Sequence, residues 1–309
     1  MKQLFNYLKD FWRQEKNAGY FLTVALFLAV LVGGNYYFDF ESSILKKFKR
    51  TWYYFPMVWI YYAVPYYFAS VTYAFFYKSS SFIIQKRFWI ISSLGLAFLA
   101  FNESFRMHYR ILELYISPGP PLYFLKKVVG DLVSFATLFV PIATYWYIKD
   151  SKKMPLYGLT AHKFDISPYF IMLIAMLPLI IIASFNEGFL DNYPVYKDYG
   201  AHTNWGIPEF WNVVLFELGY SIDFITVELF FRGFLILALA ECMGMAVIVP
   251  MATLYCIFHF GKPMGEAISS IFGGLILGIF AYNSRSIYGG ILIHISVAMC
   301  MELAAYLQK

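Results

Sequence analysis

The sequence predicts an all-α fold, a polytopic integral membrane helix bundle of about eight or nine spans. Hydrophobic residues make up 60% of the 309-residue chain and charged residues only 14%, whereas about a quarter of a typical soluble domain is charged. The mean hydropathy of +0.59 indicates the same class of protein. Apolar runs of about 20 residues, the length that a helix needs to cross a hydrocarbon core, recur along the chain.

Each predicted span is an apolar run bounded by charged or turn-forming residues. An amphipathic segment precedes the first of them, with Leu4, Leu8 and Phe11 on one helical face, and we expect it to lie at the membrane interface. Prolines interrupt several runs, which is tolerated in a membrane because neighbouring helices satisfy the freed carbonyl groups. In chain order the predicted spans are 20–38, 52–77, a short one at 88–101, 122–148, 168–185, a long one at 211–240, 246–259, 269–283 and 287–307.

Basic residues gather in clusters between the apolar runs and produce a net charge of +5. Examples are "KKFKR" at 46–50 and "KDSKK" at 149–153. Clusters in such positions are typical of segments that contact lipid headgroups. No basic groove or soluble module accompanies them, so we expect membrane lipids as partners and no nucleic acid.

The distribution of polar residues changes near residue 150, which suggests two parts of the chain. Residues 1–150 hold the N-terminal interfacial helix and aromatic-rich transmembrane helices with few charges inside the runs. Residues 151–309 carry polar side chains on separate apolar helices. We therefore predict two parts, and we expect the chemistry of the protein in the second.

Four ionisable side chains stand out within the apolar runs of that second part. Glu228 and Arg232 are four residues apart in "ITVELFFRGFLIL", and His259 and His294 follow in the next runs. A charge in a membrane segment costs about 2.5–3.5 kcal/mol on insertion scales, so such residues are functional-site candidates by default. As structural residues they would be an ion pair and two satisfied core histidines. As a functional set they offer the carboxylate and imidazoles that activate water, by general-base catalysis or around a metal ion.

These motifs resemble the CPBP intramembrane protease family, which comprises type II CAAX prenyl proteases and bacterial Abi-type bacteriocin-processing or immunity proteins. The resemblance covers roughly residues 155–309 and rests on "VELFFRG", "YCIFHFGKP" and "GGLILGIFAYNSRSIYGGILIH". The family's motifs are E-E-x-x-x-R, F-x-x-x-H, and a histidine followed four residues later by Asn or a similar polar residue. Each is short, and their order, spacing and membrane setting together make the resemblance specific.

The resemblance implies roles for the four side chains. Glu228 matches the second glutamate of the first motif and Arg232 its arginine, while His259 and His294 match the histidines of the second and third motifs. In the family, the glutamate and histidines activate a water that attacks a peptide bond, and the arginine holds the second glutamate. One view of this chemistry requires no cofactor. The other requires a divalent metal such as zinc, for which Glu228, His259 and His294 would be the ligands.

This chain departs from the family pattern at two catalytic positions. Val227 stands where the first glutamate, the general base, is expected, and Ala298 stands where the third motif has its polar oxyanion donor. Loss of either group typically costs two or more orders of magnitude in rate. Asp223, Glu302 or Glu228 itself are the carboxylates that would have to replace the missing base.

Three functions are compatible with these observations. The first is an intramembrane endopeptidase of the CPBP/CAAX-protease type with a variant active site, which cleaves a membrane-anchored or membrane-proximal peptide near the membrane surface. The alternative is a catalytically inactive family member that serves as a membrane scaffold or as an immunity or partner-binding protein. A transporter is the third, but no inverted repeat supports it. The expected location is a bacterial inner (plasma) membrane.

Overall fold

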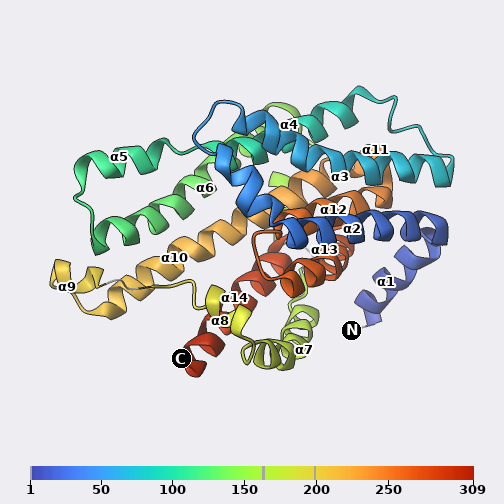
Figure 1. Ribbon diagram of the computed structural model, residues 1–309. Helices are drawn as coiled ribbons and strands as arrows, with labels where there is room; N and C mark the ends of the chain where they lie inside the picture. The colour runs from blue at the N-terminus through green and yellow to red at the C-terminus, as the bar shows by residue number, and fades with distance from the viewer. Residues whose placement is uncertain (1, 162–163, 198–199) are drawn as a thin grey trace.

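The computed structural model describes residues 2–161, 164–197 and 200–309, and these residues form helices and no strand (Figure 1). The all-α prediction is confirmed. The longer helices are α1 (Lys2–Gln14), α2 (Ala18–Phe38), α3 (Tyr54–Tyr77), α4 (Lys86–Ser104), α5 (Met107–Tyr115), α6 (Pro120–Lys149), α7 (Ser167–Ala183), α10 (Glu209–Glu228), α12 (Ile248–Phe258), α13 (Met264–Ser284) and α14 (Tyr288–Gln308).

Short helical segments connect the long helices. They are η1 (Phe40–Ile44), η2 (Leu45–Phe48), η3 (Leu156–Gly158), α8 (Glu187–Asn192), α9 (Ala201–Trp205), η4 (Leu229–Leu237), α11 (Ala240–Met243) and η5 (Gly244–Val247). Of these, η4 is a π-helix that continues α10 without a break and is buried along its whole length. Short π-helical segments inside α-helices are frequent at functional sites.

Six helical stretches among the described residues are long and apolar enough to cross a membrane, fewer than the predicted eight or nine. The difference has three physical causes. The predicted spans 211–240 and 246–259 fall within one 50-residue helical stretch. The helix α3 contains seven tyrosines, whose hydroxyl groups lower its hydropathy, and α7 has only 17 residues. The class of the fold, a polytopic helical membrane bundle, is as predicted.

One hydrophobic core joins the two halves of the chain. Tyr66 and Leu96 from the first 150 residues belong to the same buried cluster as Phe234 and Leu254 from the remainder. The helix α12 lies in its centre and packs against α3 and α13. Residues 248–257 of this helix are all buried, as expected of a helix with almost no solvent-facing surface. The predicted division at residue 150 stays a prediction.

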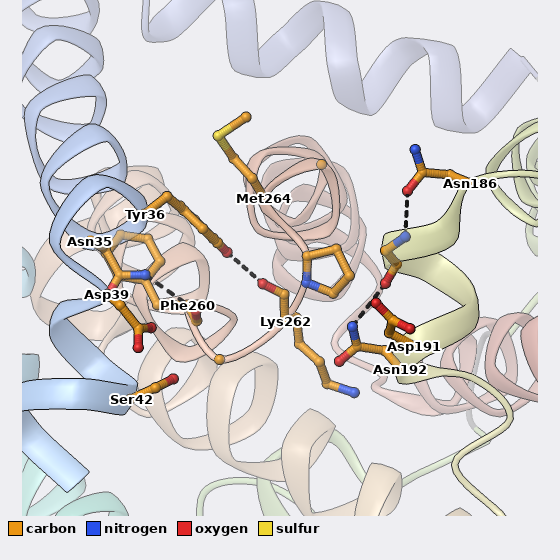
Figure 2. Close-up of a pocket in the computed structure, with 14 residues that line it drawn as sticks. Asn35, Tyr36, Asp39, Ser42, Asn186, Asp191, Asn192, Phe260, Lys262 and Met264 are labelled. Carbon is orange, nitrogen blue, oxygen red and sulfur yellow. Dashed lines mark hydrogen bonds between the residues drawn. The ribbon is translucent and has the colours of Figure 1, made fainter. Parts of the chain in front are cut away.

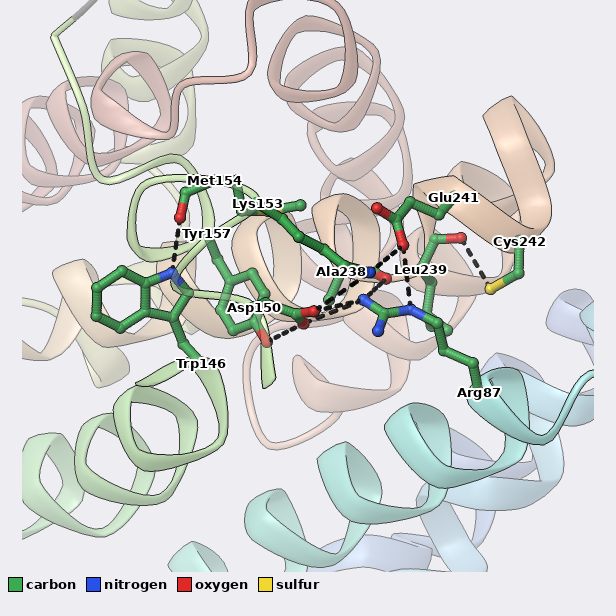
Figure 3. A network of polar contacts seen from close by, with 10 residues as sticks. All are labelled: Arg87, Trp146, Asp150, Lys153, Met154, Tyr157, Ala238, Leu239, Glu241 and Cys242. Atoms are coloured by element: carbon green, nitrogen blue, oxygen red, sulfur yellow. Dashed lines mark hydrogen bonds and ion pairs between the residues drawn. The ribbon is translucent and has the colours of Figure 1, made fainter. Parts of the chain in front are cut away.

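A buried polar network ties the segment after α6 to the end of η4 (Figure 3). Asp150 is fully buried, and its two carboxylate oxygens accept hydrogen bonds from Arg87 Nη2 at 3.1 and 3.0 Å. The Tyr157 hydroxyl donates to the same carboxylate at 2.7 Å, and burial together with this carboxylate raises the pKa of Tyr157. Arg87 also donates to the Ala238 carbonyl at 3.2 Å. The network therefore holds η4 in place from its C-terminal end.

Candidate active site

The four ionisable side chains predicted from the sequence come from four elements of the bundle. Glu228 ends α10, Arg232 lies in η4, His259 directly follows α12, and His294 lies in the second turn of α14. In the bundle α10 packs against α14 and η4, and α12 packs against η4. Glu228 and Arg232 are fully buried, whereas both histidines are partly exposed.

Glu228 pairs with two cationic or protonatable partners through one oxygen. Its Oε1 lies 2.9 Å from Arg232 Nη1 and 2.7 Å from His294 Nδ1. The i,i+4 spacing predicts a hydrogen bond from Arg232, but no N–H group of Arg232 is aligned with a hydrogen-bond acceptor, so the contact is an ion pair only. The guanidinium faces the Tyr255 ring, with its central carbon 4.3 Å from the ring centre.

His294 connects Glu228 to Tyr255. Its Nδ1 faces the carboxylate, and its Nε2 lies 2.6 Å from the Tyr255 hydroxyl oxygen. A carboxylate only accepts, so the ring proton is assigned to Nδ1, and Nε2 then accepts the hydroxyl proton of Tyr255. The Phe224 ring stacks on the imidazole with centroids 5.3 Å apart. These contacts specify one tautomer and one orientation of the ring.

His259 is oriented by the backbone of its own helix. Its Nδ1 donates to the Tyr255 carbonyl oxygen at 2.8 Å, which leaves the lone pair of Nε2 available as an acceptor. The Tyr255 and His259 rings lie with centroids 4.5 Å apart. Tyr255 therefore contacts both histidines, and the link from His259 to the Glu228–His294 pair runs through it.

Tyr255 is the polar residue of this site whose contacts sequence reasoning missed. The signal was present, since a tyrosine stands where the second motif of the resembling family has phenylalanine. A sequence motif does not show where an added hydroxyl points. In the structure the hydroxyl lies against a ring nitrogen of a residue 39 positions away.

The carboxylates considered as replacement bases are engaged elsewhere. Asp223 accepts a hydrogen bond from Ser134 Oγ of α6 at 2.7 Å. Glu302 accepts from the backbone N–H groups of Val195 at 2.7 Å and Tyr196 at 3.1 Å. Glu228 is thus the carboxylate that the structure joins directly to a histidine of the site.

Gly290 leaves the space that the Glu228 carboxylate occupies. A Cβ atom at position 290 would lie 1.9 Å from Glu228 Oε2, so any side chain there must displace the carboxylate. We expect Gly290→Ala to lower the free energy of unfolding by about 1–3 kcal/mol, the usual effect of overpacking a close-packed interior. The measurement is the melting temperature of the purified protein in detergent.

Gly273→Ala is the matched control for this substitution. Position 273 lies inside α13 and has no heavy atom within 4 Å of a built Cβ, so alanine should be neutral or stabilise the helix by up to about 1 kcal/mol. Equal melting temperatures for Gly290→Ala and the parent would contradict the close approach of α14 to Glu228.

A polar cavity of about 520 Å³ lies beside the segment that follows His259 (Figure 2). Residues of α2 line one side and residues of α8 the other, with 260–265 between them. The Tyr36 hydroxyl donates to the Lys262 carbonyl at 2.7 Å, and Asn35 Nδ2 donates to the Phe260 carbonyl at 3.2 Å. These two hydrogen bonds from α2 hold the backbone directly after His259.

The donor types of the site are those that zinc accepts, but their placement is not that of a preformed zinc centre. A carboxylate and two imidazoles are suitable ligands, whereas structural and catalytic zinc sites use at least three protein ligands around one ion. Over residues 2–161, 164–197 and 200–309, no three His, Cys, Asp or Glu side chains form such a group. The residues present therefore do not fit zinc in this arrangement.

The fold and the site define a class of protein, a polytopic helical membrane protein with a buried Glu–Arg–His cluster. Residues 209–300 match the family described as type II CAAX prenyl endopeptidase Rce1-like. The resemblance to the CPBP and CAAX-type proteases is confirmed for this segment, which supports a CAAX-type intramembrane endopeptidase fold for residues 209–300. Together with the apolar helices, the match indicates an integral membrane protein. Searches of the curated proteins and of the solved structures find no match to the chain.

Proposed function

We propose that this protein is an intramembrane endopeptidase of the CAAX-protease type whose variant active site cleaves a peptide near the membrane surface. The pairing of Glu228 Oε1 with His294 Nδ1 at 2.7 Å is the observation that supports this proposal most directly. A carboxylate in this position stabilises the imidazolium that forms when Nε2 of the same ring takes up a proton. This is the arrangement that a general base needs in order to deprotonate water.

The side chains have distinct roles in the proposed reaction. His294 is the final acceptor of a proton from water, the resulting hydroxide attacks the peptide carbonyl carbon, and the proton passes to the leaving amine when the C–N bond breaks. His259 accepts a hydrogen bond from the water through Nε2 and orients it. Arg232 keeps the buried carboxylate of Glu228 in its charged form through their ion pair at 2.9 Å.

The proposed substrate is a membrane-anchored or membrane-proximal peptide. Helices long and apolar enough to cross a membrane surround the site, and a polar cavity lies beside the segment that follows His259, which supports a substrate at the boundary between membrane and water. Burial of Glu228 within the helical bundle excludes bulk water, which strengthens every electrostatic interaction in the site. We propose a bacterial inner (plasma) membrane as the location, because the family resemblance includes bacterial Abi-type proteins.

Cleavage of membrane-anchored peptides by the purified protein tests this function. We expect slow turnover by the parent and a decrease in kcat of about 100-fold or more for Glu228→Gln, which keeps the size of the side chain and removes its charge. Glu209→Gln is the control, because it makes the same chemical change at an exposed position of the same helix. Turnover that survives Glu228→Gln would show that the base lies elsewhere.

A second candidate function is a catalytically inactive family member that serves as a membrane scaffold or immunity-type partner-binding protein. Two observations favour it. The positions of the missing base and oxyanion donor, Val227 and Ala298, are apolar and buried, and Glu228 has no exposed surface. If neither the parent nor Val227→Glu cleaves any peptide while both remain folded, this second function is the better one.

A further inference from the structure

Tyr255 contacts three of the four predicted site residues through three different groups. Its hydroxyl lies 2.6 Å from His294 Nε2, and its carbonyl oxygen accepts from His259 Nδ1 at 2.8 Å. The guanidinium carbon of Arg232 lies 4.3 Å from the centre of its ring. The residue is only 3% exposed, so these contacts are made inside the bundle.

Glu228, His294 and Tyr255 contact one another in series through groups that can carry or accept a proton. Glu228 Oε1 lies 2.7 Å from His294 Nδ1 without the alignment of a full hydrogen bond. A ring proton on Nδ1 is favoured at this distance, since two facing lone pairs would repel. The Nε2 atom therefore carries the lone pair, and the phenol donates to it. Water does not occupy the basic nitrogen of His294 in this arrangement, because the Tyr255 hydroxyl is already there.

We propose that Tyr255 is a catalytic residue that relays a proton from the attacking water to His294, an inference that rests on the proposed endopeptidase function. Tyr255 gives its hydroxyl proton to Nε2 and at the same time takes one proton from the water onto its oxygen. One O–H bond of water breaks, one N–H bond forms on His294, and Tyr255 ends as it began. The hydroxide attacks the peptide carbonyl, and Glu228 balances the charge of the imidazolium.

The relay supplies the base that the chain lacks at position 227. Valine there cannot accept a proton, and Asp223 and Glu302 are held by Ser134 and by backbone N–H groups respectively. The cation of Arg232 beside the phenol ring stabilises negative charge on the phenol oxygen while the two protons move. The resembling family has phenylalanine at position 255, which cannot relay a proton, and a glutamate at position 227, which can accept one. This chain has tyrosine and valine at these positions, so the relay replaces the function of the missing glutamate.

Removal of one hydroxyl tests the relay. We expect Tyr255→Phe to lower kcat by about 100-fold or more with little change in KM, because the ring and its packing are retained. Adding Val227→Glu to Tyr255→Phe should restore turnover. The control is Tyr66→Phe, which removes the hydroxyl of a fully buried tyrosine outside the site. A kcat for Tyr255→Phe within about threefold of the parent overturns the relay and leaves the proposed function intact.

A spectroscopic measurement separates the relay from the function on which it rests. In ¹⁵N-histidine NMR of the full chain in detergent, the His294 signals are identified by their loss in His294→Gln. We expect a neutral ring protonated on Nδ1, with an Nε2 resonance that moves towards that of a free lone pair in Tyr255→Phe but not in Tyr66→Phe. An unchanged Nε2 resonance overturns the relay alone. Absence of cleavage by both the parent and Val227→Glu overturns the proposed function and the relay with it.

Discussion

Val227→Glu should raise the rate of peptide cleavage, because it returns a carboxylate to the position that the first motif of the family uses. Val227 directly precedes Glu228 and is 9% exposed, so a glutamate there lies in the interior of the bundle beside the candidate site. A positioned general base contributes about 10²–10⁴-fold. Since the parent retains the Glu228–His294 pair, we expect an increase in kcat near the lower limit, about 100-fold. Initial rates with saturating membrane-anchored peptide measure it.

Val227→Gln is the matched control for this gain. Both variants place a polar side chain in a buried apolar position, and each should be destabilised by about 1–3 kcal/mol unless the new group finds a partner. Melting temperatures in detergent are therefore compared before the rates. A folded Val227→Glu protein that cleaves no faster than Val227→Gln would contradict the placement of residue 227 at the reacting water.

Arg232→Ala should strongly destabilise the protein. Glu228 and Arg232 are both completely buried, and their charged atoms lie 2.9 Å apart. Removing the arginine leaves a buried carboxylate whose remaining charged or polar partner is His294, and breaking a buried pair in this way costs about 3–5 kcal/mol. The substitution also removes the cation from the face of the Tyr255 ring. The free energy of unfolding in mixed detergent micelles is the quantity to measure.

Two further variants separate pairing from packing. Glu228→Gln combined with Arg232→Met removes both charges and keeps similar volumes, so it should recover most of the stability that Arg232→Ala loses. Arg106→Ala breaks a partly exposed pair with Glu103, whose charged atoms lie 3.7 Å apart, and should cost at most about 1 kcal/mol. An Arg232→Ala protein that unfolds like the parent would show that the buried pair has no structural role.

Apolar run length predicted most helices well, and its failures have identifiable causes. The last span was predicted at 287–307 and α14 is Tyr288–Gln308, because an uninterrupted apolar run has clear ends. A span was predicted at 269–283, but the helix α13 begins five residues earlier, at Met264. Pro263 caps this helix, and its first turn includes the charged residue Glu266, which an apolar run leaves out. The span predicted at 211–240 contains the change from α10 to the π-helix η4, which hydropathy does not register.

The candidate site was predictable to the extent that its residues occur in short motifs. Glu228, Arg232 and His294 are in contact, as the motif order suggests. Their geometry was not predictable, because the contact of Arg232 with the Tyr255 ring depends on how η4 packs against α12. The hydrogen bond that Asp223 accepts was equally unpredictable, since its partner Ser134 lies 89 residues away on α6.

By itself the sequence determined that this chain is a helical membrane protein and which side chains are candidates for its site, because composition, run length and motif spacing are local properties. The tertiary structure alone decided that Tyr255 joins His294, that Glu302 holds the 195–196 backbone, and that Gly290 makes room for the Glu228 carboxylate. The helical period specifies the direction of a side chain around its own axis. It does not specify how that helix is rotated and shifted against its neighbours, which packing of the whole bundle decides.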